Sequence, residues 1–175
     1  MGNFEVDLAF GQAGEVTVSK WLQSRGHMIF PAYEKEGGKF KGPQLFSSDG
    51  DLVLPDLLAF REGRAIWFEV KRKTCFSWRY ISKKWVTGID LHSYAQYQQV
   101  SERTQLPVWI IFHHPDSKPD QRDIPRGCPH TCPTGLFGNE ISVLRRVESH
   151  RHKNWGRSGM VYWAHNDLKL LRQFK

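Results

Sequence analysis

Two carboxylates and one amine stand at spacings that could hold a metal ion. Asp56 precedes a short turn at 61–64, and Glu69 and Lys71 follow that turn. If the residues flanking the turn face each other in an antiparallel hairpin, Asp56 lies directly opposite Glu69. Opposed residues have Cβ atoms roughly 4.5–5.5 Å apart, and two carboxylates at that separation repel each other. A cation between them removes the repulsion, and oxygen ligands suit Mg²⁺ or Mn²⁺.

The alternation of side chains along a strand brings Lys71 to the same place. Glu69 and Lys71 are expected on one face with Asp56, whereas Phe68 and Val70 point to the other face. This grouping suits phosphodiester hydrolysis: a metal would polarise the phosphoryl oxygens and activate a bound water. The lysine would stabilise the developing charge or orient the water. The alternative is an exposed hairpin with alternating charges, but its apolar neighbours favour a hairpin covered on both faces.

The surrounding segments predict the elements that position these residues. Helices are predicted at 4–25, ended by Gly26, and at 91–104, with Asp90 as N-cap. Strands are predicted at 27–33, 52–60, 65–73 and 108–112, and a more exposed hairpin at 75–80 and 84–87. Residues 34–50 are predicted to form a loop or an irregular hairpin. The order of these elements predicts an α/β fold with a mixed central sheet flanked by helices.

The composition changes after His113. Residues 115–133 hold five prolines and are predicted to be irregular, and a strand is predicted at 160–163. We therefore divide the chain into a core at 1–114 and a C-terminal extension at 115–175 that packs on the same domain.

A known signature matches the central hairpin. Pro55-Asp56, then a turn, then Glu69-Val70-Lys71 resembles the motif of the PD-(D/E)XK nuclease superfamily, in its Holliday-junction-resolvase-like branch. The order of elements over 5–113 is similar to that of the family. The resemblance implies a restriction-endonuclease-like core and a Mg²⁺-dependent deoxyribonuclease. It assigns catalysis to Asp56, Glu69 and Lys71, and counts Val70 with Asp56 and Glu69 among the metal-binding residues. The insertion at 34–50 departs from the compact pattern of the resolvases.

The resemblance also assigns Glu15 to the catalytic, metal-binding set, because related resolvases carry a glutamate on their first helix. Independently, Glu15 shares the apolar face of its helix with Val18 and Leu22. A buried carboxylate needs a partner, either a metal or a basic side chain. Gln98 on the second helix is expected near nucleic acid, and simple amphipathic packing is its alternative.

Basic residues follow the motif. The net charge is +7, which favours binding to polyanions. The residues expected to bind the nucleic-acid backbone are Arg72, Lys73, Arg79, Lys83 and Lys84. Trp78, Tyr80 and Trp85 lie among them and could stack on bases. The alternative is a hairpin kept soluble by its charges.

Other potential ligands are weaker. Cys128, His130 and Cys132 have a spacing that zinc accepts, but there is no second cysteine pair, so reduced thiols are favoured over structural Zn²⁺. His113 and His114 are expected to be structural or to contact DNA. No secretory signal or membrane-length apolar run is present, so a cytoplasmic or nucleoid-associated protein is expected, with a phage or mobile-element origin left open.

Together these features favour a nuclease acting on DNA, with a junction or flap as substrate in recombination, repair or mobile-element processing. Cutting two strands with one catalytic set would require a homodimer. Two alternatives stay open: a non-catalytic nucleic-acid-binding subunit on the same fold, and an RNA substrate. No membrane partner is expected.

Overall fold

The computed structural model describes residues 4–32, 44–48, 50–155 and 158–174, with side chains described from residue 11 onward. The helices are α1 (Phe4–Ser24), α2 (Leu91–Thr104) and α3 (Ile141–Arg146), with 3₁₀ turns at Ile124–Arg126 and His165–Asp167. The first strands are β1 (Met28–Pro31), β2 (Gln44–Leu45), β3 (Leu52–Val53), β4 (Leu57–Arg61), β5 (Arg64–Arg72) and β6 (Ser77–Arg79). The remaining strands are β7 (Lys84–Asp90), β8 (Val108–His114), β9 (Gly135–Glu140), β10 (His150–His152), β11 (Met160–Ala164) and β12 (Lys169–Arg172). None of the described helices combines the length and apolar character needed to cross a bilayer.

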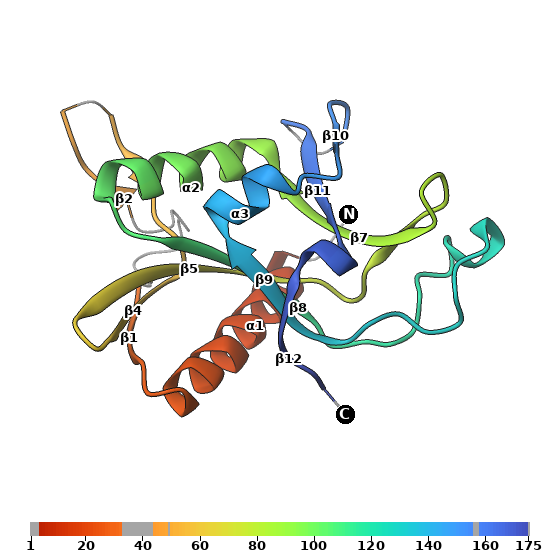
Figure 1. Ribbon diagram of the computed structural model, residues 1–175, viewed down its shortest axis with the longest axis horizontal. Coiled ribbons are helices and arrows are strands. Elements are labelled where there is room, and N and C mark those ends of the chain that lie inside the picture. The colour runs from red at the N-terminus through yellow and green to blue at the C-terminus, as the bar shows by residue number, and fades with distance from the viewer. Residues whose placement is uncertain (1–3, 33–43, 49, 156–157, 175) are drawn as a thin grey trace.

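A six-stranded mixed sheet forms the centre, in the order β1-β4-β5-β8-β9-β12. Strands β5 and β8 are parallel, and the other neighbours are antiparallel. Helix α1 lies on one side of the sheet, and α2 and α3 lie on the other (Figure 1). The predicted α/β fold with a mixed central sheet flanked by helices is confirmed. Strands β9 and β12 come from the segment 115–175, so this segment adds two strands to the same sheet.

Two cores cover the faces of β5. On the α1 side, Val18 and Leu22 pack with Phe68 and Val70. On the α2 side, the buried cluster includes Trp67 of β5 together with side chains of α2, β7, β8 and β11. Because strand side chains alternate, Glu69 and Lys71 share the α2 side with Trp67, as the sequence predicts.

The hairpin register is also confirmed. Phe60 pairs with Ala65, and the pairing continues to Leu57 opposite Phe68. The turn holds Glu62 at a φ of 51° and Gly63 at 72°. Two successive left-handed residues match the right-handed twist of a tight hairpin, so the turn itself sets the register.

The prediction of one strand over 52–60 is wrong, because the chain breaks between β3 and β4. Pro55 lies in this gap and has no N–H to donate to a ladder. Of the loop predicted at 34–50, residues 34–43 and 49 lie outside the described part. Gln44–Leu45 pairs with Leu52–Val53 as β2 and β3.

The second hairpin forms in the predicted place, with Trp78 opposite Trp85. Its predicted exposure is wrong for β7, which is buried from Trp85 to Ile89. Strand β7 lies inside a second sheet of order β10-β11-β7-β6, where β11 covers the edge that a lone hairpin would expose. The strand predicted at 160–163 is confirmed as β11.

Helix α2 begins where the sequence predicts. The side chain of Asp90 accepts hydrogen bonds from the N–H groups of His92 at 2.9 Å and Ser93 at 3.3 Å. The Ser158 hydroxyl also donates to Asp90, at 2.6 Å. The cap thus ties α2 to the C-terminal segment.

His113 and His114 at the end of β8 are structural. Their exposed fractions are 5% and 0%, which excludes direct contact of either ring with DNA in this conformation. The His114 ring stacks on Phe76, with centroids 3.7 Å apart. Burial, followed by the charge of Lys73, lowers the pKa of His114 to about 3, so its ring is neutral near neutral pH.

This burial predicts a loss of stability in acid. The unfolded chain protonates His114 below its ordinary pKa of 6.5, whereas the folded chain does so only near 3. Above pH 6.5, His114 is neutral in both the folded and the unfolded chain and costs no stability. As the pH falls from 6.5 towards 3, the free energy of unfolding decreases by up to about 1.4 kcal/mol per pH unit. Urea unfolding at several pH values would measure it in wild type and in His114→Phe, which keeps the ring stack. The exposed His130→Gln serves as the control, and an acid decline as steep in His114→Phe as in wild type would contradict the assignment.

Candidate active site

Asp56 lies at the point where the sheet opens. Strand pairing between β4 and β5 stops at Leu57 and Phe68, but β5 continues to Arg72. Asp56 therefore forms no ladder pair with Glu69, and its carboxylate turns to the backbone of β5. Its Oδ2 accepts a hydrogen bond from the Val70 N–H at 2.7 Å. The C=O and N–H of one strand residue point to the same side, so the Val70 carbonyl faces this open edge too.

Glu69 and Lys71, two residues apart on the same face of β5, form an ion pair beside Asp56. The Glu69 side chain is 2% exposed and the Lys71 side chain 31%. Glu69 Oε2 is buried and has no hydrogen-bond partner among the described residues. An orphaned carboxylate oxygen in such a place is costly unless something else binds it.

Glu15 approaches from α1, on the other face of the sheet. The approach is close at Gly14, where an added Cβ would lie 2.8 Å from the Cβ of Arg72. Only glycine permits this distance. Glu15 is half-buried, and its pKa is raised by burial and then by the charge of Glu69. Glu15 on α1 and Glu69 on β5 are therefore close enough to interact electrostatically.

The charges of the group are strongly coupled. Burial raises the pKa of Asp56 well above its ordinary value, and the charge of Glu69 raises it further. Burial by itself would lower the pKa of Lys71, but Glu69 and Asp56 together raise it. Glu15, Asp56, Glu69 and Lys71 thus occupy one electrostatic site, with more negative than positive groups.

The residues fit a hard cation in donor type. Within the described ranges, no three His, Cys, Asp or Glu side chains stand close enough together to enclose a metal ion by themselves. Mg²⁺ does not require such an enclosure, because it usually binds one or two carboxylates and completes its shell with water and substrate phosphates. Glu69 Oε2, which has no hydrogen-bond partner among the described residues, is the oxygen best placed to bind such a cation.

The predicted nucleic-acid contacts divide into two groups. Arg72 and Lys73 are half-buried at the end of β5, and burial followed by the charge of Lys71 lowers the pKa of Lys73. Arg79, Lys83 and Lys84 lie on the β6–β7 hairpin, where both lysines are exposed.

Of the three aromatic residues predicted to stack on bases, Trp85 is unsuited. It is 9% exposed and packs edge-to-face on Trp78, with centroids 5.0 Å apart. The tyrosine of the hairpin, Tyr80, is 58% exposed.

Helix α2 approaches the site through a residue that the sequence prediction missed. The ring of Tyr97 lies 5.9 Å from Lys71 Nζ, close enough for a cation–π contact. Gln98, the predicted residue, is half-buried and interacts instead with Tyr94. Tyr94 and Tyr97 are three residues apart and therefore lie on the same, buried face of α2. This spacing was the feature of the sequence that could have indicated Tyr97.

Among the described residues, the cysteines are not part of any group of three or more His, Cys, Asp or Glu side chains that could hold a metal ion. Cys132 is buried and donates from its Sγ to the Asp116 carbonyl at 3.1 Å. Burial, followed by the proximity of Cys75, raises the pKa of Cys132 to about 11. Cys128 is partly buried, and His130 is exposed. All three cysteines are free thiols.

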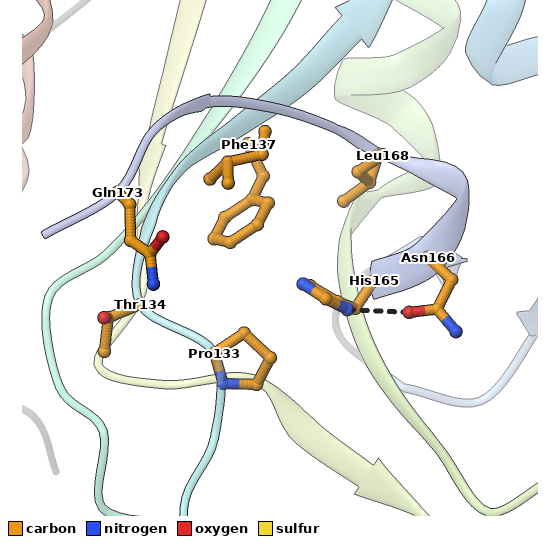
Figure 2. A pocket seen from close by; sticks show the side chains of 8 residues that line it. Pro133, Thr134, Phe137, His165, Asn166, Leu168 and Gln173 are labelled. Atoms are coloured by element: carbon orange, nitrogen blue, oxygen red, sulfur yellow. Dashed lines mark hydrogen bonds between the residues drawn. The ribbon is translucent and has the colours of Figure 1, made fainter.

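A hollow of about 560 Å³ beneath β12 is a different kind of site (Figure 2). Its lining residues are Pro133, Thr134, Phe137, His165, Asn166, Leu168, Leu170 and Gln173. Figure 2 shows His165 directed into the space and joined to Asn166 by a hydrogen bond of 2.9 Å. Without a carboxylate or a lysine or arginine, this hollow lacks the groups that hydrolysis of a phosphodiester needs.

Comparisons with known proteins give likenesses among solved structures but none in sequence. No protein-family model matches the sequence, and no curated protein matches it. Among solved structures, the chain is similar to Hjc, a Holliday junction resolvase from the archaeal hyperthermophile Archaeoglobus fulgidus. The match covers 90% of both chains with a TM-score of 0.49 and 9% sequence identity. We therefore infer the function from the side chains of this chain.

Proposed function

We propose that this protein is a metal-dependent nuclease that hydrolyses DNA phosphodiester bonds. The observation that carries the proposal is the buried Glu69, whose Oε1 pairs with Lys71 and whose Oε2 lacks a partner in the described structure. A protein gains no stability from a buried, half-satisfied carboxylate next to a second one, so a function for the pair is the better explanation.

Each residue of the site has a role in this proposal. Asp56 and Glu69, with the Val70 carbonyl and Glu15, would hold Mg²⁺ or Mn²⁺. When bound, the cation supplies Lewis-acid polarisation of the phosphoryl group and a more acidic water. Lys71 is partly exposed, so its ammonium can reach a phosphate oxygen and offset the charge that develops there. The Val70 N–H orients Asp56 for this task through its hydrogen bond.

The finer parts of the proposal concern the substrate. Resolving a four-way junction would need two strands to be cut, and a chain with one catalytic set would do this as a homodimer with two-fold symmetry. Removing a flap would need a single cut. The excess of seven positive charges would attract the DNA backbone.

A panel of substrates tests the activity. Single-stranded, duplex, flap and four-way-junction DNA are each incubated with Mg²⁺, Mn²⁺ or EDTA. We expect cleavage of at least one substrate with either metal and none with EDTA. A preparation of Asp56→Asn, purified in the same way, controls for a contaminating nuclease. Binding of all substrates without cleavage in either metal would replace the proposal by a non-catalytic binding function.

A further inference from the structure

A cleft of about 630 Å³ opens beside the β6–β7 hairpin. One wall is the hairpin itself, a second is the segment 120–126, and a third is β10 with Trp155. Figure 1 shows the segment 120–126 (teal) beside the hairpin that ends in β7, at the end of the molecule opposite the β4–β5 turn. The volume lies within the roughly 300–1,000 Å³ typical of clefts that hold small organic groups.

The cleft presents open aromatic faces. Tyr80 is 58% exposed and Trp155 is 56% exposed. His152 lies against Trp155 with centroids 4.9 Å apart, and His150 stacks on Tyr162 at 4.6 Å with their planes 8° apart. Tyr162 is buried, so the rings open to solvent are those of Tyr80 and Trp155, and these can stack on a planar ligand.

The positive charge of the cleft is only partly neutralised. Within residues 4–32, 44–48, 50–155 and 158–174, Arg79 forms no ion pair with a carboxylate. Arg126 lies 3.8 Å from Asp123, and its guanidinium also lies 6.0 Å from the ring centroid of Tyr80. Arg122 and Arg151, by contrast, are held by neighbouring carboxylates. A phosphate would therefore find Arg79 and Arg126 beside the aromatic faces.

The walls are held in place before any ligand arrives. Asp123, which is 5% exposed, accepts a hydrogen bond from the Trp78 N–H at 2.9 Å and so ties the segment 120–126 to β6. Burial, followed by the charge of Arg79, lowers the pKa of His150 to about 4. The His150 ring is thus uncharged near neutral pH and serves as an aromatic surface.

We propose that this cleft binds an unpaired nucleobase, with its flanking phosphates, from a single-stranded segment of the DNA substrate. The inference rests on the proposed function for the identity of the polymer. Open rings take the base by stacking, which is tolerant of sequence, and the arginines take the backbone. A duplex keeps its bases inside, so the cleft distinguishes unpaired from paired DNA.

The cleft is within reach of a strand that passes the candidate active site. Ser77 on the cleft wall follows Lys71 by six positions, a span of at most about 22 Å for an extended chain. A strand bound at Lys71 can therefore continue into the cleft, which would place cleavage close to a junction between paired and unpaired DNA.

Fluorescence anisotropy tests the cleft without any cleavage. The probes are a labelled oligothymidylate of about 12 nucleotides, a duplex and an oligouridylate of the same length, all in EDTA. We expect tighter binding of the oligothymidylate than of the duplex. Trp155→Ala and Tyr80→Ala should each weaken it about 5- to 150-fold, the range that loss of one base–aromatic stack produces. Arg79→Ala should weaken binding of the oligothymidylate and reduce its salt dependence by about one counterion.

Controls use matched residues away from the cleft. Phe30 is 60% exposed on β1, and Arg61 lies in the β4–β5 hairpin, so Phe30→Ala and Arg61→Ala should keep binding within about two-fold. Trp155→Ala binding as tightly as wild type, or a duplex bound as tightly as the single strand, would overturn the inference. Tighter binding of the oligouridylate would overturn its assignment to DNA.

The two proposals fail separately. Asp56→Asn lacks the proposed catalytic carboxylate but should bind the oligothymidylate like wild type, because Asp56 is not part of the cleft. Loss of cutting in Asp56→Asn together with unchanged binding in Trp155→Ala would support the nuclease and reject the cleft. If binding depends on Trp155 but the protein cuts no substrate, the cleft is supported and the nuclease is rejected.

Discussion

Replacing Glu69 by glutamine is expected to reduce DNA cleavage by about 10³-fold, the upper part of the range for removing one group that stabilises charge in a transition state. Glutamine has nearly the same shape, so the packing around this 1% exposed side chain is retained. What is lost is the negative charge that would bind the metal, on a residue whose Oε2 has no other described partner. The amide can still accept a hydrogen bond from Lys71.

Single-turnover cleavage of the best substrate in Mg²⁺ measures this loss. Glu102→Gln is the matched control, because Glu102 is exposed on α2 and its carboxylate lies 4.0 Å from Arg145. A second readout is thermal unfolding with and without Mn²⁺. Metal binding to the folded state should raise the midpoint for wild type, and much less for Glu69→Gln. Cleavage by Glu69→Gln within ten-fold of wild type, or an equal metal-induced shift, would reject the site.

The central hairpin could be predicted because its determinants are local. The turn around Glu62 and Gly63 sets which residues face each other, and alternation along β5 then sends Glu69 and Lys71 to one face. The position of Asp56 was predictable only in part. Its place next to β5 follows from the register, but its hydrogen bond to the Val70 N–H exists because pairing stops at Leu57.

Errors arose where partners come from distant parts of the sequence. Trp85 lies in a segment with the composition of an exposed hairpin, yet it belongs to the buried cluster that includes Val161 and Trp163 of β11, more than 70 residues later. Periodicity reports that a face is apolar but not what covers it. Tyr97 rather than Gln98 approaches Lys71 for a related reason, since one residue along a helix turns a side chain by about 100°.

The cleft beside the β6–β7 hairpin could not be predicted for the same reason, because its residues come from distant parts of the sequence. Its walls come mainly from residues 77–81, 120–126 and 150–155, three segments with no common motif. The sequence did indicate Arg79 and Tyr80 as nucleic-acid contacts, from charge and aromatic content around the hairpin. It could not indicate Trp155 as their neighbour, because that proximity depends on β10 and β11 joining the sheet of β6 and β7.

Replacing Lys71 by methionine is expected to lower the free energy of unfolding by about 2–4 kcal/mol. Glu69 is 2% exposed at its side chain, and Lys71 is its ion-pair partner. Removing one partner of a buried pair leaves an uncompensated charge, which typically costs about 3–5 kcal/mol. The partial exposure of Lys71 reduces this figure, because solvent screens the pair on that side.

The double variant Glu69→Gln with Lys71→Met separates charge from packing. If the cost arises from the stranded Glu69 carboxylate, glutamine at 69 should restore much of the stability that Lys71→Met loses, giving a coupling energy of about 1–3 kcal/mol. Urea unfolding in EDTA at neutral pH measures all three variants, and Lys84→Met, at an exposed position, should change stability by less than about 0.5 kcal/mol. A double variant as unstable as Lys71→Met would mean that the methylene chain of Lys71, packed toward Tyr97, carries the stability. If the double variant recovers stability, the Glu69–Lys71 ion pair is no more stabilising than an uncharged pair at the same positions. Its presence is then explained by function, as expected for a catalytic lysine.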